Sequence, residues 1–345
     1  MTLMEKEIKE QPEVLKTCIE KNRAVLKQIG EAYKKANPTF AVVAARGTSD
    51  HAATFFKYLA GVYAGLPVDL AAPSVITAYN SAPNFKNALV IGVSQSGKAA
   101  DVLSVIKTAK EQGAITIAIT NFEDSPLAKE AEFHLNCSAG LEKSVAATKT
   151  YTSQLMLLSQ IVAVITDSKE LAEKLDKVSG IVENILKDTS DIDKLVTRYC
   201  FMNECFVLGR GFLYPAAMEA ALKIQETSYV RARSYPVSDF HHGPFAMVNE
   251  GMPIFFIAAD TKTDNDVCEM MDKAKGVGAE IIAITNKEEI AKKADFSLML
   301  PKEAEGEIAI FAAAVVSQMF ACRLSVLKGN NPDSPRGLNK VTITK

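Results

Sequence analysis

An internal repeat constrains the fold of this chain more than any other feature of its sequence. Residues 113–121 read Gly-Ala-Ile-Thr-Ile-Ala-Ile-Thr-Asn, and residues 278–286 read Gly-Ala-Glu-Ile-Ile-Ala-Ile-Thr-Asn. The copies start 165 residues apart (113 against 278), which is the length of a domain and not of a solenoid repeat. Convergence on a common strand pattern is the alternative. The shared Ala-Ile-Thr-Asn ending favours duplication, and so predicts two domains.

Short apolar strands alternate with helices in both halves of the chain. The strand candidates are residues 40–45, 67–71, 88–93, 114–119, 132–136, 205–208, 253–258, 280–284 and 296–300. This alternation predicts an α/β fold with mainly parallel sheets flanked by helices. We expect an N-terminal helix within residues 1–34, interrupted or started at Pro12. Domains would then cover residues 35–188 and 189–330, and a C-terminal tail residues 331–345.

Composition narrows the class of protein. Lys and Arg total 39 against 41 Asp and Glu, a formal net charge of -2, which gives no support for a nucleic-acid-binding surface. The first residues lack the apolar core of a signal peptide. The longest apolar run, residues 308–316, is too short to span a bilayer. We therefore expect a cytoplasmic protein with neither nucleic acid nor membrane as a partner.

The six cysteines and four histidines show no metal-site spacing. The cysteines stand at positions 18, 137, 200, 205, 268 and 322, mostly in apolar periodic segments, and are expected to be reduced core thiols. We expect no metal and no cofactor.

Two hydroxyl-rich loops follow strand candidates in the first half. Gly47-Thr48-Ser49 follows residues 40–45, and Ser94-Gln95-Ser96-Gly97 follows residues 88–93. Free backbone N–H groups and the helix dipole make a strand-to-helix turn a natural anion site. Ordinary N-capping by serine explains one such loop equally well. Two loops together favour a bound phosphate, and the absence of a G-x-G-x-x-G or Walker pattern disfavours a nucleotide.

A second cluster of reactive side chains lies between residues 223 and 244. Lys223 and Glu226 are three apart and share one helix face. His241 and His242 follow in a loop closed by Gly243 and Pro244. A cation, a carboxylate and an imidazole suit acid–base chemistry on a sugar or another carbonyl compound. The alternative is an exposed ion pair beside a surface histidine.

The motifs at these residues resemble those of the sugar-isomerase (SIS) family. Within that family the chain is similar to the isomerase half of glucosamine-6-phosphate synthase and to stand-alone deaminases. The resemblance covers nearly the whole chain, and its motifs occur in order at residues 6–12, 47–49, 94–97, 145–149, 208–211, 219–226, 242–244 and 331–342. Each motif alone is weak, but the ordered set is specific.

The resemblance implies two tandem SIS domains, each a mainly parallel sheet flanked by helices, and a homodimer. It implies a sugar-phosphate substrate bound by a set of residues in the first domain and the adjoining segment: Thr48, Ser49, Ser94, Gln95, Ser96 and Val145. Glu226 would shuttle a proton between sugar C1 and C2, assisted by Lys223. His242 would reach the partner subunit's site and open the ring, and Lys340 would hold the ketose as an imine beneath the C-terminal tail.

Some positions depart from the family pattern. Lys98-Ala99 stands where the synthase has an acidic residue and a threonine, Ala147 replaces a serine, and residues 238–241 replace a usual Gly-Glu. No glutaminase segment precedes residue 1, so we expect no ammonia to be made from glutamine.

The resemblance implies conversion of an amino-sugar 6-phosphate, such as glucosamine 6-phosphate, to ketose 6-phosphate and ammonia. A deglycase for 6-phosphofructosamines and a non-catalytic sugar-phosphate sensor are the alternatives. The matches at Lys223 and Lys340 favour the amino-sugar reaction over the deglycase. The Glu/His/Lys set favours an enzyme over the sensor.

Overall fold

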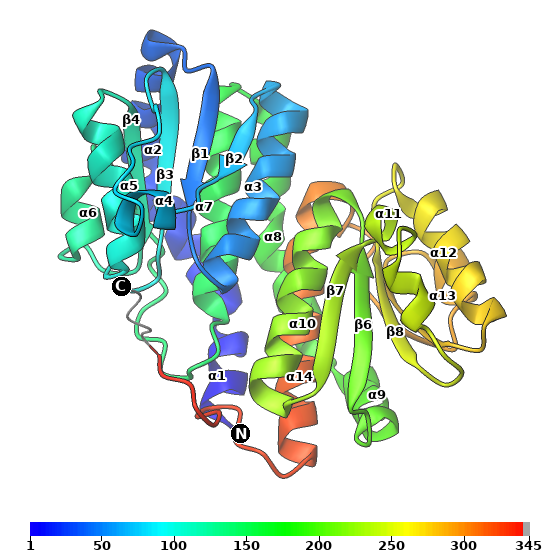
Figure 1. Ribbon diagram of the computed structural model, residues 1–345. Coiled ribbons are helices and arrows are strands. Elements are labelled where there is room, and N and C mark those ends of the chain that lie inside the picture. The colour runs from blue at the N-terminus through cyan, green and yellow to red at the C-terminus, as the bar shows by residue number, and fades with distance from the viewer. Residues whose placement is uncertain (341–345) are drawn as a thin grey trace. The chain divides into compact units, whose positions relative to one another are not determined.

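Two parallel five-stranded sheets with the same strand order organise the protein. The computed structural model describes residues 1–340, and its strands form sheets of order β2-β1-β3-β4-β5 and β10-β9-β8-β6-β7 (Figure 1). Strand β6 takes the place of β1 in the second sheet, and β8 takes the place of β3. The predicted α/β fold with two parallel sheets is confirmed. The repeated Ile-rich segments form the equivalent strands β4 and β9.

The chain divides into two compact units that are not simple halves of the sequence. The first unit contains Glu13–Glu142, Lys149–Lys177 and the end of the chain from Asn339. The second unit contains Met1–Pro12, Lys143–Thr148 and Val178–Leu338. The domain boundaries expected at residues 34, 188 and 330 remain predictions, and residues 341–345 of the expected tail lie outside the described residues.

The first unit surrounds its sheet with helices. Its strands are β1 (Phe40–Ala44), β2 (Val68–Leu70), β3 (Ala88–Val93), β4 (Ile115–Thr120) and β5 (Phe133–Asn136). Its helices are α2 (Gln11–Ala36, which starts in the second unit), α3 (Thr48–Ala64), α4 (Ser74–Thr77), α5 (Ala100–Glu111), α6 (Pro126–Glu130), α7 (Lys149–Ile165) and the first part of α8 (Lys169–Lys187). Every residue of β3 and β4 is buried, which explains why neither strand contains a charged residue.

The second unit repeats this plan. Its strands are β6 (Glu204–Gly209), β7 (Arg231–Pro236), β8 (Pro253–Ala258), β9 (Glu280–Thr285) and β10 (Phe296–Met299). Its helices are α1 (Leu3–Lys9), the end of α8, α9 (Ser190–Tyr199), α10 (Tyr214–Ser228), α11 (Val237–Phe240), α12 (Asp264–Gly276), α13 (Glu288–Ala291) and α14 (Ala309–Leu327), with short 3-10 turns at Gly211–Leu213, Pro244–Met247 and Gly306–Ile308. Pro12, the second residue of α2, stands where it starts the main N-terminal helix, as predicted.

Strand β7 has no counterpart among the predicted strands. Its sequence, Arg-Ala-Arg-Ser-Tyr-Pro, is mostly polar, and only Ala232 is fully buried. It lies at the edge of the second sheet, paired in parallel with β6 alone among the described strands. An edge strand needs little apolar sequence and tolerates a terminal proline, so its pattern carries a weak signal.

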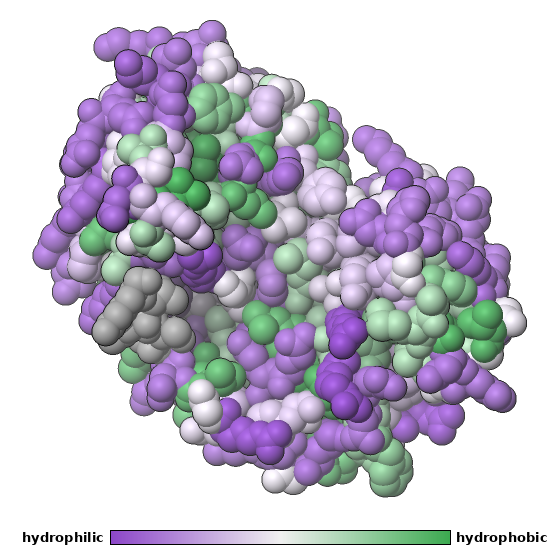
Figure 2. Space-filling view, in the orientation of Figure 1, coloured by the Kyte–Doolittle hydropathy of each residue, from purple (hydrophilic) through white to green (hydrophobic). Residues whose placement is uncertain are grey.

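Helix α14 is apolar on every side because it is buried on every side. By length and composition, the segment Gly306–Leu327 could cross a membrane. The uninterrupted apolar run within it, residues 308–316, is too short to do so on its own. In the structure, 83% of its most apolar window is buried inside the protein. It packs against α10 and α9 in the second unit. The segment is thus a core helix. Figure 2 shows that hydrophilic residues cover most of the drawn face of the protein.

Gly97 shapes the turn between β3 and α5. Its φ is +62°, its N–H donates to the carbonyl of Ser94 at 3.1 Å, and its carbonyl accepts from the N–H of Leu127 at 3.1 Å. A Cβ at this position would overlap the hydroxyl of Ser125. Glycine is required here by both conformation and space.

We expect Gly97→Ala to lower the free energy of unfolding by roughly 2–4 kcal/mol, because left-handed strain adds to the overlap. Gly113→Ala is the matched control, since Gly113 has a φ of +79° and nothing within 4 Å of an added Cβ. The free energy of unfolding of this variant should fall only by the cost of the left-handed strain, about 1–2 kcal/mol. Equal losses in urea denaturation of the two variants would show that the Ser125 contact does not constrain the loop.

Candidate functional site

The two predicted hydroxyl-rich loops lie on neighbouring strands of the first sheet. Thr48 and Ser49 begin α3 directly after β1, and Ser94 to Ser96 follow β3, which pairs with β1. The chain continues from β1 to β2 on one side, and β4 lies on the other side of β3. In sheets of this order, ligands bind at the carboxyl ends of the strands where the connections diverge. The location therefore suits an anion.

The loop after β3 is held by backbone hydrogen bonds. The N–H of Ser94 donates to the carbonyl of Ile119 at 3.0 Å, and the N–H of Asn121 donates to the carbonyl of Gln95 at 3.0 Å. Ser94 is buried, whereas Gln95 and Ser96 are partly exposed. The backbone of this loop is thus fixed, as a preformed binding loop requires.

Arg46 stands beside these loops and was not among the predicted site residues. Its Nε donates to Oδ2 of Asp101 at 2.7 Å, and Asp101 is buried in the first turn of α5. Arg46 itself is exposed. Burial raises the pKa of nearby Asp50, while His51 and Arg46 oppose that shift. The available sequence signal was a cation immediately before Gly47-Thr48-Ser49, which adds positive charge where an anion is expected.

Helix α10 carries a buried lysine between two carboxylates. Nζ of Lys223 lies 3.3 Å from Oε1 of Glu219 and 2.5 Å from Oε2 of Glu226. The side chains of Lys223 and Glu219 are 0% and 1% exposed, whereas that of Glu226 is 22% exposed. Lys223 and Glu226 lie on one helix face, as their spacing predicts, and they form an ion pair that is not the exposed surface pair of the alternative interpretation. Glu219, one turn earlier, completes the arrangement and was not predicted.

The charges of the neighbours decide the protonation state of Lys223. Burial alone would lower the pKa of its ammonium, but the carboxylates of Glu219 and Glu226 outweigh burial and raise that pKa above its usual value. Lys223 therefore stays charged and holds the carboxylate of Glu226 in place. A fixed, partly exposed carboxylate is a suitable general base.

His242 lies in an exposed turn of the same unit. Its N–H donates to the carbonyl of Asp239 at 3.0 Å, directly after α11. The neighbouring His241 contacts Nζ of Lys273 through Nδ1 at 3.4 Å. Exposure leaves the His242 ring accessible, and its expected role toward a partner subunit stays a prediction.

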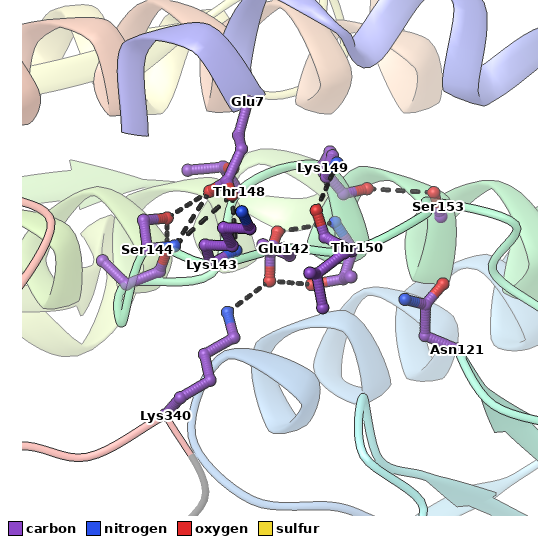
Figure 3. A network of polar contacts seen from close by, with 12 residues as sticks. Glu7, Asn121, Glu142, Lys143, Ser144, Thr148, Lys149, Thr150, Ser153 and Lys340 are labelled. Atoms are coloured by element: carbon purple, nitrogen blue, oxygen red, sulfur yellow. Dashed lines mark hydrogen bonds and ion pairs between the residues drawn. The ribbon is translucent and has the colours of Figure 1, made fainter. Parts of the chain in front are cut away.

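Val145 lies in the segment 143–148 of the second unit, which is held by a buried carboxylate. Glu7 accepts hydrogen bonds from the N–H of Lys143 at 2.5 Å and from the N–H and hydroxyl of Ser144 (Figure 3). The N–H of Val145 donates to the carbonyl of Asp333 at 3.1 Å. The position of Val145 is therefore fixed by two distant parts of the chain, whereas its contact with substrate remains a prediction.

Lys340, the last described residue, makes an ion pair in the first unit. Its Nζ lies 2.6 Å from Oε2 of Glu142, as Figure 3 shows. Glu142 also accepts from Thr150 at the start of α7. Glu142 was not predicted, because a single glutamate in a small polar segment carries no spacing signal. Among residues 1–340, no group of three or more His, Cys, Asp or Glu side chains is arranged to hold a metal ion.

The family follows from comparison with known proteins. The SIS domain model matches residues 37–164 and 202–328. The chain belongs to the SIS domain family. It is 34% identical over 99% of its length to a glutamine–fructose-6-phosphate aminotransferase (isomerizing) of Thermococcus kodakarensis, and 33% identical to the Aquifex aeolicus enzyme of that name. It spans 58% and 57% of those relatives, so it corresponds to about half of each.

Solved structures of SIS proteins share this fold. The C-terminal domain of glucosamine-fructose-6-phosphate aminotransferase from Francisella tularensis matches with a TM-score of 0.87 and 27% identity, over 97% of this chain and 98% of that one. A glucosamine-6-phosphate deaminase from Thermotoga maritima matches with a TM-score of 0.77 and 20% identity, over 99% and 100% of the two chains. The second likeness shows the fold alone.

We expect Lys223→Met to destabilise the protein by about 3–5 kcal/mol at neutral pH, because it leaves the buried carboxylate of Glu219 without its cation. The lysine's raised pKa means that its contribution is complete at every pH below the ordinary lysine range. The deficit should shrink only as the pH rises above that range, since the wild type then loses the contribution of the charged lysine.

Lys194→Met serves as the control in the same pH series of urea denaturation. Lys194 forms an exposed ion pair with Asp191, and its loss should leave stability unchanged. A Lys223→Met variant as stable as the wild type would mean that the two carboxylates are not held charged by this lysine.

Proposed function

We propose that this chain is a phosphosugar isomerase that converts an amino-sugar 6-phosphate, glucosamine 6-phosphate or a close isomer, to ketose 6-phosphate and ammonia. The observation that carries the proposal is the carboxylate of Glu226, partly exposed and anchored by the buried ammonium of Lys223. An aldose–ketose isomerisation needs one such base. The names of the aminotransferase relatives, which join fructose 6-phosphate with isomerisation, support the substrate class.

The phosphate would bind the loops after β1 and β3. Thr48, Ser49, Ser94 and Ser96 offer hydroxyls, Gln95 an amide, and the N-terminus of α3 its dipole. Binding at this remote group supplies orientation for the reacting carbons. His242 of a second copy would open the sugar ring, as the family resemblance implies. A homodimer is part of this proposal.

The reaction would then move two protons and one amine. Glu226 takes the hydrogen from C2 of the open-chain amino sugar and returns it to C1. A second proton passes from the C2 ammonium to the C1 oxygen, which leaves a hydroxyl at C1 and an iminium group at C2. The amine of Lys340 displaces ammonia from this iminium carbon and becomes bound as an imine. Water then releases the ketose and restores the lysine. Each step uses side chains of this protein and needs no redox partner.

We expect the protein to release ammonia from at least one hexosamine 6-phosphate and to form the matching ketose 6-phosphate. The assay is a coupled ammonia measurement over hexosamine 6-phosphates and 6-phosphofructosamines. Ammonia from the hexosamine phosphates supports the proposal. Cleavage of only the phosphofructosamines would instead identify a deglycase, and binding without turnover would identify a sensor.

We expect Ser94→Ala combined with Ser96→Ala to raise the KM for the phosphorylated sugar tenfold or more, because the loop loses two hydroxyl donors to the phosphate. Affinity for the matching non-phosphorylated sugar, measured by calorimetry, should stay within a few-fold. Ser104→Ala on the outer part of α5 is the control. Equal weakening of both ligands would place the phosphate elsewhere.

A further inference from the structure

The buried carboxylate of Glu142 is the centre of a small polar network in the first unit. Its side chain is 0% exposed, and it accepts the N–H of Thr150 at 3.1 Å, the hydroxyl of Thr150 at 2.8 Å and Nζ of Lys340 at 2.6 Å. Figure 3 shows Lys340 reaching toward this carboxylate from the C-terminal segment. Donors from two parts of the chain thus fix the position of one carboxylate.

The surroundings of this carboxylate pair it and fix its orientation. Thr150 belongs to the first turn of α7, where exposed N–H groups and the helix dipole favour negative charge. A buried carboxylate is costly unless it is paired and hydrogen-bonded, and here it is both. The pair ties Lys340 to the start of α7 through Glu142 and Thr150.

The ion pair creates a chemical problem for the proposed role of Lys340. An amine attacks a carbonyl carbon only in its neutral form, whereas a lysine side chain is ordinarily an ammonium at neutral pH, and Nζ of Lys340 is paired with the carboxylate at 2.6 Å. A group that removes the proton must therefore act before the carbon–nitrogen bond forms. Glu142 is in contact with Nζ, within direct hydrogen-bond reach.

We propose that Glu142 positions Lys340 and acts as the base that takes its proton when the imine forms. This inference rests on the proposed function, in which Lys340 forms an imine with a ketose 6-phosphate. It assigns to Glu142 a second acid–base role, separate from that of Glu226.

The step balances in atoms and charge. The ammonium of Lys340 gives one proton to Glu142, and the nitrogen lone pair forms a bond to C2 as the carbonyl π bond breaks. Proton transfer within the adduct gives a neutral carbinolamine. Glu142 then returns its proton to the departing hydroxyl, water leaves, and the nitrogen lone pair completes the iminium group. The carboxylate is regenerated, and the net change is ammonium plus ketone to iminium plus water.

Other polar groups near Glu142 do not replace it in this role. Nζ of Lys149 donates to the carbonyl of Leu141 at 3.0 Å and is itself a cation. Burial raises the pKa of the Cys137 thiol well above its usual value, and the charges of Cys18 and Glu142 raise it further. Cys137 therefore stays a neutral thiol and cannot accept a proton from an ammonium.

The experiment measures the rate at which fructose 6-phosphate and cyanoborohydride label Lys340, followed by peptide mass spectrometry at several pH values. For the wild type the labelling rate should be nearly constant over the pH range between the usual pKa values of a carboxylate and a lysine, because Glu142 takes the proton from Lys340. Glu142→Gln should label about 10- to 100-fold more slowly at neutral pH. Its rate should rise about tenfold per pH unit, since only the neutral amine then reacts.

Thr150→Val is the matched control, because it removes the hydroxyl bond from Thr150 to Glu142 and keeps the ion pair with Lys340. It should retain the constant pH profile. If the role of Glu142 were merely structural, Thr150→Val and Glu142→Gln would show the same pH profile. If Glu142→Gln does not fold, Glu142→Asp decides, with a constant profile at a reduced rate expected. An aspartate variant whose labelling rate rises about tenfold per pH unit, as if no internal base were present, overturns the inference.

The remaining outcomes distinguish the two proposals. A wild-type protein that is not labelled at Lys340 removes the imine from the proposed function. A labelled wild type with an equally fast or faster Glu142→Gln variant overturns the role of Glu142 alone. Faster labelling in particular would mean that the pair restrains Lys340.

Discussion

Parallel strand order is the constraint on which the rest of this structure depends. A parallel sheet is covered on both faces, so polar groups that must meet a ligand are confined to its ends. In the first sheet β1 and β3 are neighbours, and the segments after them carry the hydroxyl-rich loops. Gly97 allows the second of these turns to pack on Ser125 without a clash. The site thus follows from the order of the strands.

Buried charge is the second feature that links stability to function. Lys223 and Glu142 are both inaccessible to solvent, and each is held by opposite charge and further hydrogen bonds. In both pairs the partner that would meet the sugar, Glu226 or Lys340, is the more exposed one, at 22% and 23%. A buried ion can therefore hold a more exposed, reactive partner in place.

The sequence predicted the elements whose signals are local. Buried strands such as β3 and β8 read as continuous apolar runs, and the two loops follow them directly. Strand β7 was missed because an edge strand lacks that pattern. The partner of Lys340 was missed for a different reason, since Glu142 lies 198 residues away and only the folded chain brings the two together. Glu219 could have been found, because it precedes Lys223 by four residues on the same helix.

The central claim is that a carboxylate on α10 moves a proton between C1 and C2 of a phosphorylated sugar. The most direct test is incubation of the protein with fructose 6-phosphate in heavy water, followed by NMR of the recovered sugar. The account predicts that one C1 hydrogen is replaced by deuterium, and that Glu226→Gln loses this exchange while still binding the sugar. Exchange that persists in Glu226→Gln, or binding of ketose 6-phosphates without any exchange at C1 in the wild type, would contradict it.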